Sequence, residues 1–438
     1  MEYQSYPKYK RSRIDWLHEI PEHWDETVIS ALFEDNKHKN KGSVEQNLLS
    51  LSYGRIINKD INTEEGLLPA SFETYQIVNP DYIVLRLTDL QNDQRSLRVG
   101  HVCEKGIITS AYTGLKKKSF RISSARYFYY LLHAYDLLKV FYGMGAGVRQ
   151  SLGFDELKKI RLLLPSDEEQ EHIVQFLDRE TTRIDALIEK KQRLIELLKE
   201  KRQAVITQAV TKGLDPNVPM KDSGVEWLGE VPEHWKVVRV KHVTSFCTSG
   251  SRGWGDFISD EGEIFLQSGD LTDEMGVNFD SAPRVELPIG AEGIRTRVDS
   301  GDVIVCITGA KTGRVGYVEN IPEVAYVNQH LALLKPITSF VSGQWLGINL
   351  TSEVGQISFQ LNQYGLKEGL GLSNILNTPV VAPPIDEQQN ITRYIKQTSS
   401  TIDSLIKKSL SSIDLLREHR SALITAAVTG QIDVRNLA

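Results

Sequence analysis

The sequence predicts an α+β protein in which two mixed α/β domains are separated by a pair of long antiparallel coiled-coil helices. Three observations lead to this fold class. Two segments occur twice in the chain, one of them runs from Asp167 to Lys212 without glycine or proline, and the blocks between the repeats hold short strand-like runs. We therefore expect a pseudo-twofold internal repeat, with two different domains inserted into one duplicated frame.

The first repeat is a short motif rich in tryptophan. Asp15–Trp24 reads DWLHEIPEHW and Glu226–Trp235 reads EWLGEVPEHW, with seven of ten positions identical at an offset of 211. We call it the tryptophan motif. Its Trp, Leu and Pro residues indicate a structural role at a helix end, and we expect His23 and His234 to be buried hydrogen-bonding residues rather than metal ligands.

The second repeat is longer. Gly147–Asp215 aligns with Gly365–Asp433 at an offset of 218, without a gap and with 24 identities in 69 positions. The blocks between the repeats, 25–146 and 236–364, show no convincing similarity to each other. A duplicated frame with different inserts predicts one task performed twice, on two different targets.

The repeats divide the chain into six parts. These are an N-terminal segment 1–24, a first variable domain 25–160, a first long helix 161–213, a linker with the second tryptophan motif 214–235, a second variable domain 236–380, and a second long helix with a C-terminal tail 381–438.

The duplicated long segments are predicted to be helices. Apolar residues recur in steps of three and four, which is the period of a helix with one apolar face. Ser166 and Glu169 have the spacing of a capping box, whereas the second copy begins with Pro384, and Gly213 and Gly430 end the two helices. About 40 residues at 1.5 Å each give roughly 60 Å. Such a helix needs a partner, so we expect the two copies to pair; two unrelated surface helices are the alternative.

The variable blocks are predicted to be rich in strands. The segment 125–142 reads as a helix with many aromatic residues. The strand-like runs, bounded by Gly, Asn, Asp or Pro, are Asp81–Leu87, His101–Val102, Ile107–Ser110, Gly301–Gly309, Gly316–Val318 and Glu323–Leu334.

Composition excludes several classes of protein. Apolar residues make up 40% and charged residues 25%, which is ordinary for a globular protein. No stretch of 18 apolar residues and no signal peptide is evident. Cys103, Cys247 and Cys306 form no CxxC pair, so neither disulfides nor a zinc site is predicted. We expect a cytoplasmic protein in a reducing environment.

Three segments imitate catalytic motifs. Asn79–Tyr82 (NPDY) resembles an adenine-methyltransferase signature but has Asp at its third position. The glycine-rich Gly143–Gly147 follows a predicted helix rather than a strand, and Gly309–Gly313 lacks the glycine before its lysine, so neither fits a cofactor or phosphate loop. We predict no catalytic residues, no metal and no cofactor in this chain.

Candidate DNA contacts are basic and polar residues in glycine-rich or lysine-rich segments. Lysines suit phosphates, and Arg and Gln can read base edges in the major groove. In the first block, which holds 18 basic and 14 acidic residues over 31–159, the candidates are Tyr112, Lys116, Lys117, Lys118, Arg149 and Gln150.

The second block is acidic, with 11 basic and 16 acidic residues over 236–379, which counts against DNA binding. Arg149 aligns with Lys367, which favours a shared phosphate contact. For every cluster, solvated loops are the alternative interpretation. The candidates here are Ser249, Ser251, Arg252, Trp254, Lys311, Arg314, Tyr364 and Lys367.

Several motifs together resemble a type I restriction-modification specificity subunit. They are the tryptophan motifs, the pattern PxxxEQ before each long helix, TxAVTxxxD at each helix end, GDVIVCITGAKTGRVGYV and AYVNQHLALLKP. The resemblance implies that two target-recognition domains each read half of a bipartite, asymmetric DNA site and that the helix pair sets the spacer. It also implies that the subunit has no catalysis of its own.

The resemblance further implies partners. Two methyltransferase subunits, which use S-adenosylmethionine, would dock on the chain, and restriction subunits would add ATP- and Mg-dependent translocation and cleavage. Glu200, Arg202, Glu418 and Arg420 are candidates for partner docking, with intrahelical ion pairs as the alternative. Two other functions stay open: a coiled-coil adaptor that binds proteins, and a self-contained enzyme.

Overall fold

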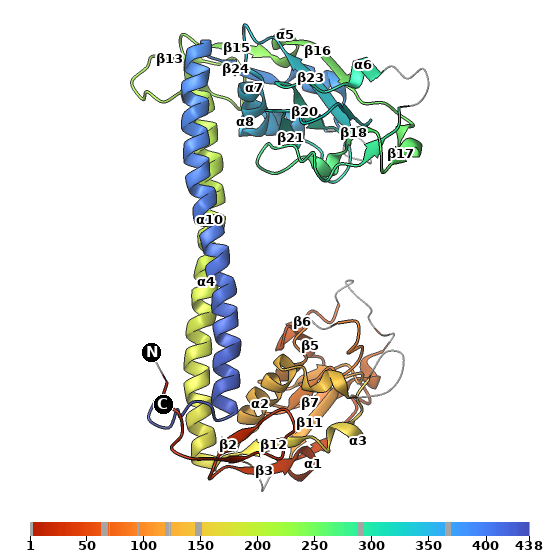
Figure 1. The fold of residues 1–438 in the computed structure, drawn as a ribbon, viewed down its shortest axis with the longest axis vertical. Helices are drawn as coiled ribbons and strands as arrows, with labels where there is room; N and C mark the ends of the chain where they lie inside the picture. The colour runs from red at the N-terminus through yellow and green to blue at the C-terminus, as the bar shows by residue number, and fades with distance from the viewer. Residues whose placement is uncertain are drawn as a thin grey trace. The chain divides into compact units, whose positions relative to one another are not determined.

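The computed structural model describes residues 3–62, 69, 71–93, 96–118, 122, 124–144, 151–287, 293–363 and 369–437. The chain forms two compact units. Unit 1 comprises Met1–Lys191 and Leu410–Ala438, and unit 2 comprises Gln192–Ser409. Each unit contains one sheet domain and a part of two long helices (Figure 1). The predicted mixed α+β class with a pair of long helices is therefore confirmed.

The long helices are α4 (Asp167–Lys212) and α10 (Ile385–Val428). In unit 1 the early α4 residues Ile173 and Ile184 share a core with the late α10 residues Ile424 and Val428. In unit 2 late residues of α4 share a core with early residues of α10. The helices thus pair antiparallel, and the expected interruption-free helix from Asp167 to Lys212 is confirmed.

The start of α4 differs from the predicted capping box. The Ser166 hydroxyl accepts the backbone N–H of Glu169 at 3.3 Å, as expected of an N-cap. The Glu169 side chain does not turn back to the N-cap; it is buried and contacts Tyr6 and His23. The reciprocal half of the box was wrong, because a tertiary contact takes that carboxylate.

Unit 1 contains two four-stranded sheets. The first has the order β4-β11-β8-β9, and its neighbours are all antiparallel. The second has the order β6-β5-β10-β7, with β10 parallel to β5. The strands are β4 (Phe33–Asp35), β5 (Leu48–Ser52), β6 (Arg55–Lys59), β7 (Gln76–Val78), β8 (Ile83–Leu85), β9 (Val99–His101), β10 (Gly106–Ile108) and β11 (Thr113–Lys117).

Unit 2 also contains two four-stranded sheets. The orders are β16-β23-β20-β21, again wholly antiparallel, and β17-β19-β18-β22, with β18 parallel to β22. The strands are β16 (Thr244–Ser249), β17 (Ile258–Ser259), β18 (Glu263–Leu266), β19 (Arg284–Val285), β20 (Val303–Cys306), β21 (Val315–Tyr317), β22 (Ala325–Val327) and β23 (Leu331–Pro336).

The two sheet domains share one strand frame although their sequences show no convincing similarity. Strands β4, β8, β9 and β11 correspond in connection and pairing to β16, β20, β21 and β23. The parallel pair of β5 with β10 corresponds to that of β18 with β22. The two domains therefore carry different side chains on the same arrangement of strands. This shared arrangement was not evident from the sequence.

Short paired strands join each sheet domain to its helices. The hairpin β1 (Tyr9–Arg11) with β2 (Glu19–Pro21) recurs as β13 (Met220–Asp222) with β14 (Glu230–Pro232). Strand β3 (Asp25–Val28) pairs with β12 (Arg161–Leu164) just before α4, and β15 (Lys236–Arg239) pairs with β24 (Pro379–Ala382) just before α10. The remaining helices are α1 (Ile29–Leu32), α2 (Arg126–Leu137), α3 (Phe154–Leu157), α5 (Val240–Val243), α6 (Gly293–Thr296), α7 (Gly343–Thr351), α8 (Glu353–Asn362) and α9 (Leu372–Asn377).

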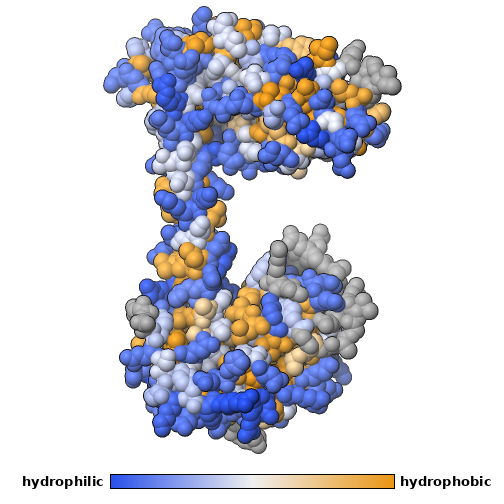
Figure 2. All heavy atoms as spheres, in the orientation of Figure 1, coloured by the Kyte–Doolittle hydropathy of each residue, from blue (hydrophilic) through white to orange (hydrophobic). Residues whose placement is uncertain are grey.

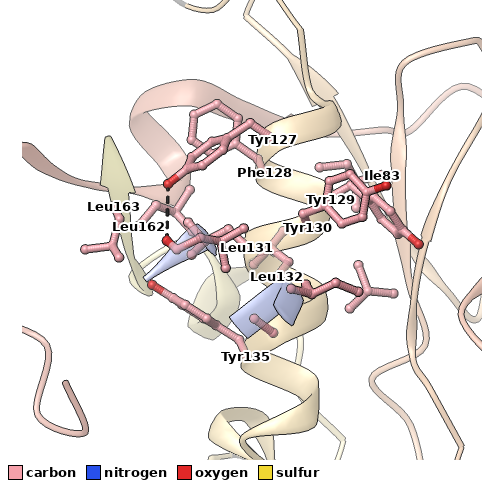
Figure 3. Packing of buried hydrophobic residues seen from close by; sticks show 14 of the residues in the cluster. Ile83, Tyr127, Phe128, Tyr129, Tyr130, Leu131, Leu132, Tyr135, Leu162 and Leu163 are labelled. Atoms are coloured by element: carbon pink, nitrogen blue, oxygen red, sulfur yellow. Dashed lines mark hydrogen bonds between the residues drawn. The ribbon is translucent and has the colours of Figure 1, made fainter. Parts of the chain in front are cut away.

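Helix α2 supplies the centre of the unit 1 core. Its aromatic residues Tyr127, Phe128 and Tyr135 are at most 1% exposed and lie in one buried cluster with Leu162 and Leu163 of β12 (Figure 3). The helix ends at Leu137 rather than near residue 142, because Lys139 takes a positive φ of 62° and a 3-10 turn follows. The described part of unit 2 packs its core around α7 and α8, neither of which the sequence pattern indicated.

Candidate nucleic-acid interface and helix junctions

The three predicted lysines lie at the end of β11, and each amino group has a partner within the chain. Lys116 is exposed and pairs with Glu34 at 2.8 Å across the sheet. Lys117 contacts Asp81 at 2.6 Å, and Lys118 donates to the backbone carbonyl of Ser30 at 2.5 Å. An exposed ion pair such as that of Lys116 contributes little to stability. Lys116 can therefore exchange Glu34 for a phosphate at small cost, whereas Lys117 and Lys118 support the fold.

Asp81, in the segment that resembles a methyltransferase motif, has a structural task. Its carboxylate accepts the backbone N–H of Ala125 at 2.9 Å, contacts His101 at 3.3 Å and pairs with Lys117. Burial alone would raise the pKa of this carboxyl, but the contacts with His101, Lys117 and Ala125 outweigh burial and lower the pKa to about 2. The ionised side chain thus fixes the start of α2 against the sheet.

A basic loop that the sequence reasoning missed lies between β4 and β5. Lys37, His38, Lys39 and Lys41 are all exposed, and Lys39 donates to Ser110 at 2.5 Å. The hairpin between β5 and β6 turns through Tyr53 and Gly54, both with positive φ, and the Tyr53 side chain is 79% exposed. The run KHKNK was visible in the sequence and could have marked this loop as a phosphate-binding candidate.

Of the predicted contacts at the start of the second sheet domain, Trp254 is buried, whereas Ser249 and Ser251 are half-buried. Trp254 is 6% exposed and forms a small core with Phe265 and Tyr326, so its indole has no surface for a base. A Cβ at Gly250 would lie 2.0 Å from the carbonyl oxygen of Val327, which explains the glycine. Arg252 remains exposed.

Lys311 and Arg314 line a shallow polar depression. Lys311 donates to the carbonyl of Gly269 at 2.9 Å, while Arg314 pairs with Asp273 at 2.6 Å and donates to the carbonyl of Leu271 at 3.0 Å. Thr351 lines the same depression, and its hydroxyl has no hydrogen-bond partner in the described part of the chain. Lys311 and Arg314 thus stabilise the segment from Gly269 to Asp273, and both line the open depression.

Arg149, Gln150, Tyr364 and Lys367 lie outside the described residues.

Each tryptophan motif contacts the start of one long helix and the end of the other. In unit 1, His23 contacts Glu169 at 2.9 Å near the start of α4, and a Cβ at Gly430, just after α10, would meet Pro21 at 2.4 Å and Trp24 at 3.3 Å. Tyr6 donates to the same Glu169 at 2.7 Å. Burial, with Glu169 adding to it, raises the pKa of Tyr6 well above its usual range.

Unit 2 repeats this junction. His234 contacts Glu387 at 2.9 Å near the start of α10, and a Cβ at Gly213, after α4, would lie 3.2 Å from Trp235. Both tryptophans are fully buried, as a structural role requires. The two histidines were expected to be buried, but their side chains are 45% and 47% exposed; only their role as hydrogen-bonding residues holds.

The two arginines proposed for partner docking form ion pairs between the long helices. Arg420 of α10 contacts Asp185 of α4 at 3.1 Å in unit 1, and Arg202 of α4 lies 3.8 Å from Asp403 of α10 in unit 2. These pairs are equivalent under the offset of 218. Glu200 and Glu418 are exposed.

The helix pair also exposes apolar side chains. Figure 2 shows hydrophobic residues interrupting the polar surface of the helices on the visible face. Leu187 is 39% exposed and its equivalent Leu405 is 45% exposed; Leu197 and its equivalent Leu415 are 46% and 66% exposed. Equivalent helix positions therefore present leucines at the surface of each unit.

The described residues contain neither a cluster of metal ligands nor a membrane-spanning helix. No group of three or more His, Cys, Asp or Glu residues there has the arrangement of a metal site. No helix in the described ranges is long and apolar enough to cross a bilayer.

Comparison with known proteins gives consistent matches. A family model for the type I restriction modification DNA specificity domain matches residues 104–197 and 260–414, together more than half of the chain. The chain is 23% identical over 349 residues to the type I restriction enzyme MjaVIII specificity subunit of Methanocaldococcus jannaschii, with 76% of each protein covered. It is 25% identical over 315 residues to the EcoBI specificity subunit of Escherichia coli, covering 70% of this chain and 65% of that protein.

Two solved structures share the fold. A chain from work on complex assembly and conformational transition of the type I R-M system has a TM-score of 0.70 at 14% identity, covering 94% of this chain and 99% of that one. The HsdS subunit from Thermoanaerobacter tengcongensis has a TM-score of 0.53 at 13% identity, covering 94% and 98%. At these identities the likeness concerns the fold.

Proposed function

The chain belongs to the family of type I restriction-modification DNA specificity proteins, and on this premise we propose that each of its sheet domains reads one half of a bipartite, asymmetric DNA site. The observation that carries the proposal is the shared strand frame. Two domains with the same pairing of strands and dissimilar sequences suit two readers of different half-sites, since base edges are read by side chains and not by the backbone frame.

Phosphate contacts in unit 1 are assigned first to exposed cations. Lys37, Lys39 and Lys41 form a basic loop, and the amino group of Lys116 forms an exposed ion pair with Glu34. We retain Tyr112, Arg149, Gln150, Ser249, Ser251, Arg252, Lys311, Arg314, Tyr364 and Lys367 as proposed contacts, and we drop Trp254, which is a core residue.

The helix pair is proposed to set the spacer and to dock two methyltransferase subunits. Equivalent exposed leucines in the two units, Leu187 with Leu405 and Leu197 with Leu415, supply two equivalent apolar surfaces for two copies of one partner. Because Arg202 and Arg420 are engaged between the helices, Glu200 and Glu418 are the better polar candidates.

The chemistry is proposed to reside in the partners. The methyltransferase subunits would bring S-adenosylmethionine and methylate adenine, and restriction subunits would use ATP and Mg²⁺. The chain itself would be non-catalytic and cytoplasmic. No observation favours a coiled-coil adaptor that binds proteins, which would show no salt-dependent binding of DNA.

Exchange of one variable block tests independent reading. Residues 25–146 are replaced by the equivalent block of another family member, and methylated adenines are mapped in cells that also express the methyltransferase subunit. One half-site should change while the other half-site and the spacer stay the same. A change in both half-sites would refute the proposal.

A matched insertion tests the role of the helices. One heptad inserted at equivalent positions of α4 and α10 should lengthen the recognised spacer and leave both half-sites unchanged, since seven residues preserve the apolar face. Altered half-sites with an unchanged spacer would show that the helices do not set the spacing.

A further inference from the structure

Equivalent positions of the two long helices carry opposite charges. Asp178 of α4 and Lys396 of α10 correspond under the offset of 218, within the repeated segment. Each of them contacts the sheet domain of its own unit through a side chain of opposite charge. The charge reversal therefore lies at a position where each long helix contacts a sheet domain.

In unit 1 the contact is close and has several hydrogen bonds. Arg126, the first residue of α2, places its Nε 2.9 and 2.8 Å from the two carboxylate oxygens of Asp178, and its Nη2 lies 2.8 Å from Oδ1. One helical turn later, the Tyr130 hydroxyl donates to the same carboxylate at 2.6 Å. The Arg126 and Asp178 side chains are 34% and 36% exposed, and such multidentate charged contacts are geometrically demanding.

In unit 2 the polarity is reversed and the contact is more open. Lys396 lies 3.2 Å from Glu319, and their side chains are 65% and 62% exposed. Glu319 follows the end of β21 by two residues. In the shared frame β21 corresponds to β9, whose last residue, His101, lies 3.2 Å from Arg126. The two sheet domains thus reach the same helix position from neighbouring points of the frame.

A second contact between sheet domain and helix does not distinguish the copies. Arg55 of β6 pairs with Asp185 of α4 at 2.5 Å, but the equivalent of Asp185 is Asp403, which is also acidic. Arg55 would therefore meet a carboxylate on either helix. Of these two contact positions, that of Asp178 and Lys396 is the one where the equivalent residues have opposite charges.

We propose that the residue pair Asp178 and Lys396 matches each sheet domain to its own long helix. Exchange of the two domains would set Arg126 against Lys396 and Glu319 against Asp178, so both exchanged arrangements create a like-charge contact. A system discriminates between partners by penalising the wrong pairing as well as by favouring the right one. The assignment of domain to helix rests on the structure; its consequence, a fixed order of the two half-sites, rests on the proposed function.

Charge reversal in the full chain tests the matching without DNA or partners. Asp178→Lys and Arg126→Glu should each lower the melting temperature of the transition assigned to unit 1 by roughly 3–6 °C, judged from ordinary domain thermodynamics. The double variant should recover at least half of that loss. Additive losses, or no loss from Asp178→Lys, would overturn the proposal. The milder Asp178→Asn should lower the melting temperature by less than the reversal does, and an equal drop would mean lost hydrogen bonds and no charge matching.

A domain exchange tests the discrimination itself. In a chain with residues 25–146 and 236–364 interchanged, the paired change Asp178→Lys with Lys396→Asp should raise the melting temperature. The matched control, Glu189→Lys with Lys407→Glu, also reverses charges at equivalent exposed positions. This control should leave the melting temperature of the exchanged chain unchanged. Equal effects of the two paired changes would contradict the matching. Because calorimetry requires no DNA, failure of the proposed DNA function would leave this result intact.

Discussion

A glycine series tests the helix junctions quantitatively. Gly430 and Gly213 follow α10 and α4 with φ of 74° and 73°, and Gly229 has φ of 67° in the hairpin of the second tryptophan motif. Replacement by alanine forces a left-handed backbone on a residue with a Cβ, which costs about 1–2 kcal/mol at each of the three positions. The positions differ in what the new Cβ would meet.

The neighbours set the expected order of the losses. Around Gly229 nothing lies within 4 Å, so Gly229→Ala carries the backbone cost alone. At Gly213 the nearest atom belongs to Trp235 at 3.2 Å, which adds little. At Gly430 the ring of Pro21 lies 2.4 and 2.6 Å away, and relieving such an overlap adds about 1–3 kcal/mol. We expect total losses of about 1–2 kcal/mol at Gly229, slightly more at Gly213 and about 2–5 kcal/mol at Gly430.

Calorimetry of the full chain measures these losses, with hydrogen exchange reporting which junction opens. Asparagine separates the two causes, because it tolerates the left-handed region better than alanine does. Gly229→Asn should regain stability relative to Gly229→Ala, whereas Gly430→Asn should stay as unstable as Gly430→Ala. If Gly430→Ala lost no more stability than Gly229→Ala, the close packing of the first tryptophan motif against the end of α10 would be contradicted.

Three further predictions concern pH, the helix pair and DNA. Burial, with a smaller effect of Arg420, lowers the pKa of His133 to about 4; since this lies below the unfolded value, stability is fully present above about pH 6.5 and falls by about 3 kcal/mol as pH drops towards 4. His133→Phe should flatten that slope in pH-dependent unfolding, and an unchanged slope would exclude His133 as its source. Asp185→Asn should lower the free energy of unfolding by about 1–2 kcal/mol in a thermal melt, because Asp185 pairs with both Arg420 and Arg55. Asp403→Asn should lower it by under about 1 kcal/mol. Equal losses from the two variants would contradict the stronger pairing of Asp185. Changing Lys37, Lys39 and Lys41 to alanine should reduce the salt dependence of DNA binding by the assembled complex by up to about 0.9 per lost phosphate contact, whereas Lys8→Ala with Lys10→Ala in the first hairpin should leave the slope unchanged.

The long helices could be predicted because their signals are local and repeated. The period of apolar residues and the lack of glycine or proline define α4 from Asp167 to Lys212 without reference to the rest of the chain. The shared strand frame could not be predicted, because most of its strands span only two to five residues and several, such as β8 and β20, are buried at every position. Such strands lack the alternation that marks an exposed sheet.

The candidate site could be predicted only in part from the sequence, for a related reason. Charge runs identify lysines, but the partners that occupy Lys117 and Lys118 are Asp81 and Ser30, distant in the sequence. Likewise, the side chain of Glu169 had a plausible local use in a capping box, and only the fold brings Tyr6 and His23 to it. Trp254 stands in a segment of candidate DNA contacts, yet Phe265 and Tyr326 pack around its side chain and bury it.

The most direct test of the central claim is genome-wide mapping of methylated adenine in cells that co-express this chain with its methyltransferase subunit. The account predicts a single bipartite motif with a fixed gap, present only when this chain is present. A contiguous or one-sided motif would mean that one sheet domain is not a reader. No new methylation, with both proteins folded and bound to each other, would contradict the proposed specificity function.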